Sequence, residues 1–478
     1  MSNHSNNRPS RPGAGSRATP AGNAGSLHAQ NRPTTSGRLS LKNSVKLSPE
    51  QMWPAFASCP RGLENLLSAE LQALGAQQYK PVMGGVEFSA TWADLLTMNL
   101  WSAIAGRILM RLDHQPCTSE TELYRLIKRT PWVDWFRPQQ SIRVDLNNLG
   151  VELPNARFLQ LRVKDAVCDH FRDASGIRPN VDLENPDVRI VVALGPTHAS
   201  VYIDLSGENL FKRGWRQEKG NAPLKENLAA GIVRLSGWKA DTPLLDPFCG
   251  SGTILIEAAS MATDRAPGLD RRFGFENLRG FDSALWNTLK AQAEQRFEAG
   301  LQSAGHLTLQ GSDITRLLVE MSDSNARRAG FGPLLDDGRL RFEQRDARTI
   351  EPVERVKALV TQRQSEPDSV ATIGDGHDIA GSAGTLLCNP PYGERLEAKG
   401  ARIEQDEAYV QLFEDIGTRL KQQFAGWRFC CLTADLELRK SLGLSPKRKT
   451  PLYNGALECR LFEFPLTQGT YRPRSEAG

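Results

Sequence analysis

The tetrad Asn389-Pro390-Pro391-Tyr392 is the part of the sequence whose residue types point most directly to chemistry. Two consecutive prolines fix a rigid turn, which would hold the Asn389 side-chain oxygen and the Pro390 carbonyl at a set separation. Two such acceptors suit an exocyclic NH₂ group, because they orient its nitrogen lone pair toward an incoming methyl group. The ring of Tyr392 offers a surface on which a nucleic-acid base can stack. The tetrad therefore predicts a site that holds the amino group of a base.

A glycine-containing turn lies upstream, after the apolar pair Leu244-Leu245 and before an apolar helical stretch. Glycine lets the backbone pass close beneath a ligand at the carboxyl end of a strand. The turn alone is a weak signal, since many nucleotide-binding folds use one, and the absence of a Gly-Lys-Ser/Thr sequence excludes a phosphate-binding P-loop. The residues of this turn that we predict to bind a cofactor are Asp246, Pro247, Phe248, Cys249, Gly250, Gly252 and Thr253.

Acidic residues follow the next two predicted strands. Asp313 is expected to accept hydrogen bonds from ribose hydroxyls, and Asp346 to meet the amino group of an adenine. Their neighbours Ile314 and Ala347 are predicted to contact the same cofactor, as is Asn389. A single acid after a strand is usually a turn former or a helix cap. Three strand ends in this order, with the tetrad at the fourth, instead indicate one cofactor site.

This arrangement predicts methyl transfer from S-adenosylmethionine (SAM). A sulfonium cofactor brings its own leaving group, so the protein has to supply alignment and electrostatics rather than a strong general base. A competing hypothesis is covalent catalysis by a cysteine on a pyrimidine ring carbon, because Cys249 and Cys388 lie near the predicted pocket. A nucleophilic thiol needs a lowered pKa. Cys388 ends an apolar strand without a basic neighbour in sequence, and we therefore favour the non-covalent route.

The elements that position these residues fall into two regions. From about Gly237, strands alternate with helices, as is typical of a doubly wound, Rossmann-like α/β sheet. Its predicted strands are Pro243–Asp246, Leu307–Asp313, Arg339–Arg345, Ala383–Cys388, Trp427–Thr433 and Glu458–Phe464. Residues 53–205 mix both element types and predict an α+β module. Its predicted elements are a helix over Leu63–Leu74 closed by Gly75, a strand over Val82–Phe88, a long helix over Thr91–Leu112, strands over Ser141–Asn147, Val188–Gly195 and Ala199–Asp204, and a helix over Asn155–Arg172.

Composition bounds the class of protein. With 478 residues, 40% apolar and 24% charged, the chain suits two or three soluble globular domains. There is no apolar run of membrane-spanning length and no signal-peptide pattern. The eight cysteines are scattered without a CxxC pair. The sequence therefore predicts a cytoplasmic protein with reduced thiols and no metal site.

Two segments lie outside this pattern. Residues 1–49 carry seven basic side chains and no acidic one, so the remainder has a net charge of 4 minus 7, or −3. Their Ser, Asn, Gly and Pro content predicts a disordered tail, which either attracts phosphate weakly or is a passive solvated arm. Residues 361–384 are rich in Gly, Asp and Ser and predict a flexible surface insertion.

Several blocks in the sequence resemble a known family. The chain is similar to THUMP-domain RNA methyltransferases and, within them, to bacterial 23S rRNA guanine-N2 methyltransferases. Five blocks appear in family order over roughly residues 53–465, and a closing signature follows them. These blocks are Asp204–Glu208, Lys212–Arg216, Ala222–Ala230, Asp246–Thr253 and Asn389–Leu396, and the signature is Leu452–Cys459.

The resemblance implies a ferredoxin-like piece over 50–90, a THUMP RNA-binding domain over 91–205 and a class I methyltransferase domain over 206–470. It also implies that Pro223, Lys225 and Glu226 lie beside the cofactor, although Lys225 read alone is an ordinary solvated helix residue. The RNA contacts implied are Arg157, Lys164, Arg213 and Arg216. The expected partner is large-subunit ribosomal RNA or its precursor. From this resemblance we expect a protein without the second, guanine-N7 methyltransferase domain that fused relatives carry.

Other functions stay open at this point. The tetrad serves adenine N6 as well as guanine N2, so a DNA adenine-N6 methyltransferase is one alternative. A tRNA guanine-N2 methyltransferase would have the same architecture. An RNA-binding scaffold without activity is a third, which the intact Asp246, Asp313 and Asn389 disfavour. The oligomeric state cannot be read from the sequence.

Overall fold

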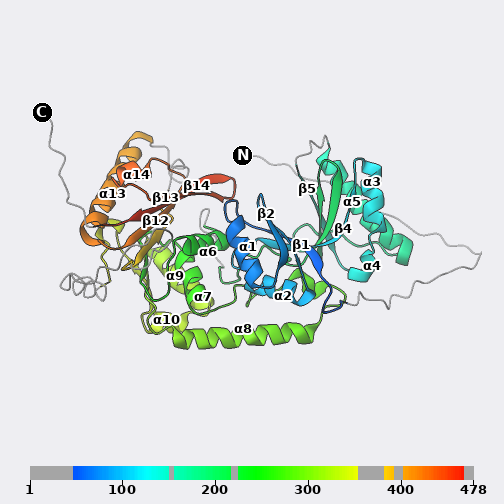
Figure 1. The fold of residues 1–478 in the computed structure, drawn as a ribbon, viewed down its shortest axis with the longest axis horizontal. Coiled ribbons are helices and arrows are strands. Elements are labelled where there is room, and N and C mark those ends of the chain that lie inside the picture. Colours follow the sequence, from blue (N-terminus) through cyan, green and yellow to red (C-terminus); the bar gives the residue numbers. More distant parts are fainter. Residues whose placement is uncertain (1–46, 150–154, 217–223, 354–381, 392–401, 468–478) are drawn as a thin grey trace, which may run out of the picture. The chain divides into compact units, whose positions relative to one another are not determined.

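The computed structural model describes residues 47–149, 155–216, 224–353, 382–391 and 402–467, with residues 402–406 described by their backbone alone (Figure 1). The predicted basic tail and the predicted insertion at 361–384 lie almost entirely outside these residues. Two seven-stranded sheets organise the described part of the chain. No helix among the described residues is long and apolar enough to cross a membrane.

The first sheet, sheet A, belongs to the α+β module and has the order β2-β3-β1-β4-β7-β6-β5. All its neighbours are antiparallel except β5 and β6, which run parallel. Its strands are β1 (Trp53–Ser58), β2 (Gln77–Val82), β3 (Gly85–Ala90), β4 (Arg107–Pro116), β5 (Ile142–Asn148), β6 (Val188–Leu194) and β7 (His198–Asp204). Its helices are α1 (Glu64–Ala73), α2 (Trp92–Trp101), α3 (Glu120–Arg129), α4 (Trp132–Trp135) and α5 (Ala156–Ser175).

Two predictions for this module were wrong. The strand expected over Val82–Phe88 is a hairpin that turns at Gly84, whose φ of +79° favours glycine. The helix expected over Thr91–Leu112 ends at Trp101, and β4 follows from Arg107. A continuous apolar run does not distinguish a buried helix from a buried strand, and this run contains both.

The second sheet, sheet B, has the order β10-β9-β8-β11-β12-β14-β13. The run from β10 to β12 is parallel, and β14 and β13 add antiparallel strands at one side. Its strands are β8 (Leu244–Asp246), β9 (Leu309–Asp313), β10 (Leu340–Gln344), β11 (Thr385–Cys388), β12 (Arg428–Thr433), β13 (Arg448–Asn454) and β14 (Leu457–Pro465). All six predicted strands are confirmed within a few residues, while β13 was not predicted.

Helices cover both faces of sheet B, as in a doubly wound fold. Leu387 of β11 packs into the same core as Ile254 of α7, whereas its neighbour Leu386 packs with Phe413 of α13. The alternation of side chains along β11 thus divides them between two helical layers. The helices are α6 (Glu226–Leu235), α7 (Thr253–Ala262), α8 (Ser283–Ser303), α9 (Arg316–Arg328), α10 (Gly332–Asp336), α13 (Arg402–Gln423) and α14 (Leu438–Ser441), with 3₁₀ turns η1 (Gly274–Asn277) and η2 (Ala347–Thr349).

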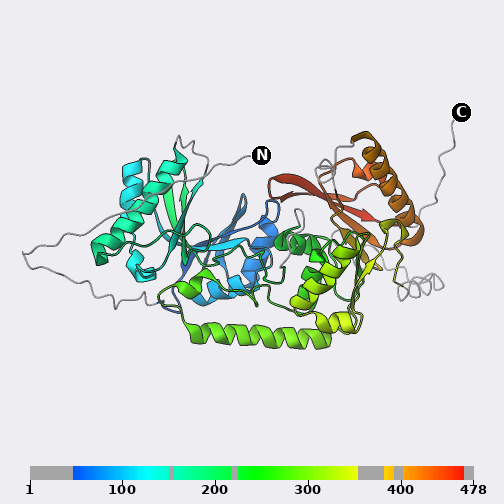
Figure 2. The same cartoon turned by 180° about the vertical axis from the view of Figure 1, so that it is seen from behind.

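The long helix α8 also contacts the N-terminal module, where it lies along α2 (Figures 1 and 2). The guanidinium of Arg296 lies 3.8 Å from the centre of the Trp101 ring. The same side chain bonds Asp264 through two nitrogens, at 2.6 and 2.9 Å. A cation held over an aromatic face by a bidentate carboxylate fixes the direction of this helix.

Candidate active site

The predicted site residues meet at one edge of sheet B. β8, β9, β10 and β11 are parallel, so their carboxyl ends point the same way. In the ladder Asp246 lies opposite Gly311, and Asp313 lies opposite Gln344. Asn389 directly follows β11. Residues spread over more than 140 positions of sequence thus come to a common edge, where ligands of open α/β sheets bind.

The glycines of the turn after β8 have different tasks. Gly252 has a φ of +82° and begins α7, and an added Cβ would lie 3.1 Å from the Cβ of Ser322. Close packing therefore requires glycine there. Gly250 has a φ of +54°, but nothing lies within 4 Å of the position its Cβ would take. The backbone at Gly250 borders open space of the kind a ligand can fill.

Asp313 ties this turn to the end of β9. One of its carboxylate oxygens accepts from the Gly250 amide at 3.1 Å, and the other from the Thr315 amide at 2.9 Å. Each oxygen retains a lone pair for a ribose hydroxyl. Ile314 beside it is 65% exposed, so an apolar side chain borders the same edge.

Asp246 is the most perturbed acid of the site. It is buried, and its carboxylate accepts from the Phe248 amide at 3.1 Å. Burial is the main cause that raises its pKa to about 8; the Phe248 amide opposes this rise, and the negative charge of Asp313 adds to it. Phe248 itself stacks on Phe413 of α13 at 6.0 Å. The Asp-Pro-Phe sequence therefore anchors the turn in the core.

Arg216 clamps the turn to the start of α6. Its guanidinium donates to Glu226 at 2.8 Å, to the Ser251 hydroxyl at 3.0 Å and to the Thr253 hydroxyl at 2.7 Å. Its side chain is 12% exposed. We predicted Arg216 as an RNA contact. In the structure its guanidinium supports the turn through these bonds, and its contact with RNA stays a prediction.

The structure places Arg213, the other arginine predicted to contact RNA near the glycine turn, in the interior. Its side chain is buried, pairs with buried Glu257 of α7 at 3.3 Å, and donates to the Ala103 carbonyl at 2.6 Å. A guanidinium enclosed in this way is not available to RNA. A basic residue near a motif gives no sequence signal that separates a buried partner of a carboxylate from a surface contact.

Most of the remaining predicted residues can be placed. Arg157 is exposed on α5, and Lys164 on the same helix pairs with Asp165 at 2.8 Å. Lys225 caps α6, with its ammonium 5.2 Å from the Phe211 ring centre. The Asp346 carboxylate binds Arg348, and Ala347 is buried. The predicted residues Pro223 and Tyr392 lie outside the described part of the chain.

The tetrad supplies an unpaired acceptor. The side-chain oxygen of Asn389 is buried and has no hydrogen-bond partner among the described residues. Pro390 is buried and Pro391 is exposed. Leaving a buried amide oxygen unpaired is unfavourable, so such an atom at a strand end indicates a missing donor. The donor that the tetrad predicts is an amino group.

The cysteines near this edge are unsuited to nucleophilic attack. Cys249 and Cys388 are both buried, and burial raises the pKa of each thiol well above its usual value. The charges of Asp246 and Asp313 raise the pKa of Cys249 further. Neutral thiols are poor nucleophiles, which disfavours the covalent hypothesis. Among the residues described, no group of three or more His, Cys, Asp or Glu side chains is placed to hold a metal ion.

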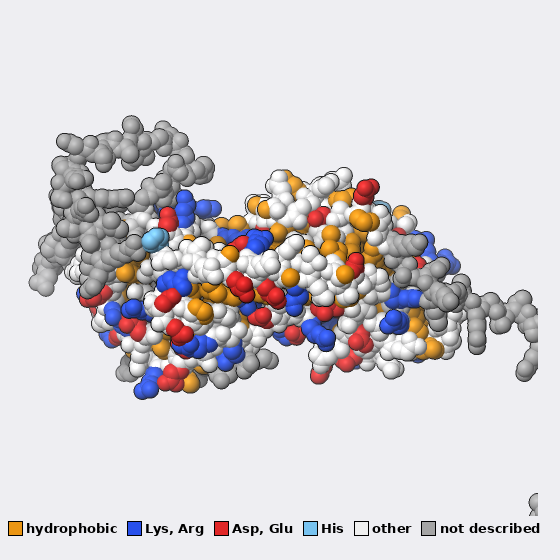
Figure 3. Space-filling model, turned by 90° about the horizontal axis from the view of Figure 1, so that it is seen from below, with side chains coloured by type: hydrophobic (Ala, Val, Ile, Leu, Met, Phe, Trp, Pro, Cys, Tyr) orange, Lys and Arg blue, Asp and Glu red, His pale blue; other side chains and the backbone are white. Residues whose placement is uncertain are grey.

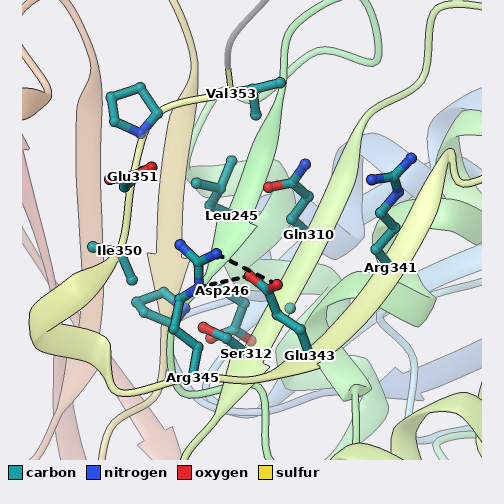
Figure 4. A pocket seen from close by; sticks show the side chains of 13 residues that line it. Leu245, Asp246, Gln310, Ser312, Arg341, Glu343, Arg345, Ile350, Glu351 and Val353 are labelled. Carbon is teal, nitrogen blue, oxygen red and sulfur yellow. Dashed lines mark hydrogen bonds and ion pairs between the residues drawn. The ribbon is translucent and has the colours of Figure 1, made fainter.

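A hollow of about 290 Å³ opens beside Asp246 and Pro247 (Figure 4). It is lined on the β10 side by Arg341, Glu343 and Arg345, and the last two pair at 2.8 Å. Gln310 and Ser312 of β9 share it. Leu245, Ile350 and Val353 line it as well, so the space next to the predicted cofactor edge offers both polar and apolar contacts.

Parallel strands, a glycine turn after the first of them, and acids and an Asn-Pro-Pro sequence at successive strand ends are the arrangement of class I methyltransferases. Comparison with protein families supports the same class of enzyme. Residues 213–363 and 371–463 match the RMKL-like methyltransferase domain, 117–204 the THUMP domain, and 55–109 the RlmL ferredoxin-like domain. The first match covers more than half of the chain. The chain therefore belongs to the RMKL-like methyltransferase family, and it is a SAM-dependent methyltransferase with a THUMP domain.

Solved structures show the same architecture. A possible methylase from Clostridium difficile 630 is 25% identical, with a TM-score of 0.71 over 89% of this chain and 100% of its own. The candidate methyltransferase SMU.472, in complex with SAH, is 28% identical. Its TM-score is 0.70, and the match covers 88% of this chain and 100% of SMU.472. A third similar structure is a protein from Listeria monocytogenes str. 4b F2365, described as a predicted N6-adenine-specific DNA methylase. It is 26% identical, with a TM-score of 0.70, and the match covers 87% of this chain and 96% of the Listeria protein.

Proposed function

We propose that this protein methylates the exocyclic N2 amino group of a guanine in 23S ribosomal RNA or its precursor. The observation that carries the proposal is the buried, unpaired Asn389 oxygen at the end of β11. It lies at the edge that bears the glycine turn and Asp313, in a chain with a THUMP domain and an RlmL ferredoxin-like domain.

The residues present fit SAM. Gly250 borders open space, Asp313 offers lone pairs for ribose hydroxyls, and exposed Ile314 offers an apolar surface for an adenine ring. The complex of the similar protein SMU.472 with SAH, the product form of the cofactor, supports SAM as the cofactor. When bound, SAM supplies an activated methyl group on a sulfonium.

The side chains of this chain then have to orient the acceptor. Asn389 accepts one hydrogen of the target amino group through its free oxygen, and the Pro390 carbonyl accepts the other. This geometry turns the nitrogen lone pair toward the cofactor edge. No carboxylate is needed to remove a proton before transfer, because the nitrogen becomes strongly acidic only as it gains the methyl group. A neutral Asn389 is consistent with this order of events.

Charge on the surface does not by itself select RNA. The face drawn in Figure 3 carries basic and acidic side chains next to one another, without one continuous basic field. Many arginines pair with nearby carboxylates, such as Arg162 with Glu120 and Arg178 with Asp165. Recognition of the nucleic acid is therefore assigned in this proposal to the THUMP module and to the base pocket rather than to net charge.

The test is to incubate the protein with methyl-labelled SAM and, separately, with 23S ribosomal RNA, tRNA and duplex DNA. N2-methylguanosine in unmodified 23S RNA is the expected product. Label in tRNA guanine would assign the tRNA alternative. Label only in DNA adenine, as the description of the Listeria relative suggests for that protein, would refute the proposal.

A further inference from the structure

Asp435 and Tyr409 lie beside the tetrad and have no part in the site described so far. β12 runs parallel to β11, with Cys431 opposite Cys388, so the residues after both strands emerge at the same edge. Asp435 lies two residues beyond the end of β12. Tyr409, on α13, packs against Phe413, and its hydroxyl lies close to Cys388, Cys431 and Asp435.

The Asp435 carboxylate is held in place. Its backbone amide donates to the Thr433 hydroxyl at 3.0 Å, and its oxygen Oδ1 accepts from the Glu437 amide at 2.8 Å. Bonds within the loop thus fix the direction of the carboxylate, and its oxygens retain lone pairs for another donor. A preorganised acceptor of this kind needs little reordering when a ligand arrives.

The Tyr409 hydroxyl is buried and has no hydrogen bond of normal geometry among the described residues. Burial and the nearby charge of Asp435 raise the pKa of its phenol, so it stays a protonated donor. It and the Asn389 oxygen are two unpaired buried polar atoms on either side of the β11 and β12 ends. Together with Asp435 they form a rim that suits the hydrogen-bonding edge of a base.

Guanine and adenine differ at the atom next to the amino group. In guanine, N2 neighbours N1–H, a donor; in adenine, N6 neighbours N1, an acceptor. Once Asn389 and Pro390 hold the amino group, a carboxylate facing N1 binds guanine and repels adenine. We propose that Asp435, with the Tyr409 hydroxyl beside it, accepts the N1–H of the target guanine and selects guanine over adenine. This inference rests on the function proposed above.

The test uses the ribosomal RNA fragment that carries the mapped target, made once with guanine and once with 2-aminopurine at that position. 2-Aminopurine keeps the N2 amino group and replaces N1–H by an acceptor. The wild-type protein is expected to prefer guanine by about 100-fold in kcat/KM, as expected for loss of a charge-assisted hydrogen bond and an unpaired carboxylate. The missing O6 of 2-aminopurine affects all variants alike.

Asp435→Asn is the decisive variant, because its amide can donate to N1 of 2-aminopurine. It should lower kcat/KM for guanine and narrow the preference for guanine by about 10-fold or more. Tyr409→Phe should narrow the preference less and leave the affinity for SAM unchanged. Glu437→Gln removes a negative charge from the same loop through an exposed side chain, and it should leave the preference at its wild-type value.

The outcomes separate the two proposals. Absence of wild-type methylation on the guanine fragment refutes the proposed function. Wild-type methylation with an Asp435→Asn preference equal to wild type refutes the role of Asp435. An equal fall in kcat/KM for guanine and for 2-aminopurine also refutes the role of Asp435, because such a fall shows a merely structural effect. If Asp435→Asn does not fold, Asp435→Glu replaces it, with a narrowed preference expected and an unchanged one contradicting the proposal.

Discussion

The two seven-stranded sheets of this chain place their strand ends in opposite ways. In sheet B, five parallel strands bring their carboxyl ends to one edge, and Asp246, Asp313 and Asn389 meet there. In sheet A, nearly all neighbours are antiparallel, so successive strand ends alternate between two edges. A polar residue after a strand therefore has a predictable neighbour in sheet B and no predictable neighbour in sheet A.

This difference assigns different tasks to the two regions. A parallel sheet brings the residues after its strands to one edge, where a small ligand can bind. An antiparallel sheet covered by helices presents faces and loops, which suit the binding of a large partner. If the comparison is right, variants at the edge of sheet B change turnover, and variants on the helices of sheet A change RNA affinity alone.

The largest expected effect lies between the two regions. Arg213 bonds the Ala103 carbonyl of the N-terminal module and Glu257 of α7. Arg213→Met should lower the free energy of unfolding by about 3–5 kcal/mol, because it leaves a buried carboxylate without its partner. Urea unfolding measures this. The double variant Arg213→Met with Glu257→Met should regain most of the loss; an unchanged single variant would show that the pair is dispensable.

The next largest effect tests the chemistry of sheet B. Asn389→Ala should reduce kcat by about 100- to 1000-fold, since it removes a preorganised group from the reacting amine. The affinities for SAM and RNA should stay within a few-fold of wild type. Single-turnover methylation and calorimetric binding separate these quantities. Asn185→Ala, an exposed change before β6 of sheet A, is the matched control and should have no effect. Equal loss of turnover and cofactor affinity would mean that the tetrad is structural.

The parallel edge is also the part that the sequence predicted best. The apolar runs before Asp246, Asp313 and Asn389 predicted the positions of β8, β9 and β11 within a few residues. β13 escaped prediction because Arg448–Asn454 contains proline and basic residues and has little apolar alternation.

Partners of side chains were harder to predict than strand ends. Nothing in the sequence separates Arg213 and Arg216, which are enclosed, from surface arginines, because enclosure depends on contacts far apart in the chain. Asp435 lies two residues beyond β12, and Asp313 is the last residue of β9, so a search for acids near the ends of predicted parallel strands would have found Asp435. Tyr409 had no such signal, since its position depends on how α13 packs.

A smaller effect concerns how the edge responds to pH. Folded Asp246 keeps its proton up to pH about 8, whereas the unfolded side chain loses it near pH 4. The unfolded state therefore binds fewer protons in this window, and the group lowers stability progressively as pH rises through it. The stability of Asp246→Asn relative to wild type should increase as pH rises from about 4 to about 8 and level off above pH 8. Unfolding at several pH values checks this; a constant difference between pH 4 and 8 would contradict it.

The smallest effect tests sheet A. Arg157 and Lys164 lie on α5, far in sequence from the edge of sheet B. Changing both to Ala should weaken RNA binding by several-fold at low salt and reduce the dependence of log affinity on log salt by up to about two, as for two lost phosphate contacts. Because Lys164 pairs with Asp165, Lys164 should contribute less to the salt dependence than Arg157 does. Turnover at saturating RNA should not change. Lys239→Ala with Lys421→Ala removes the same charge from the sheet B region and should leave the salt dependence unaltered. An equal effect of both pairs would mean that RNA is attracted by net charge, and the division of tasks between the two sheets would then be wrong.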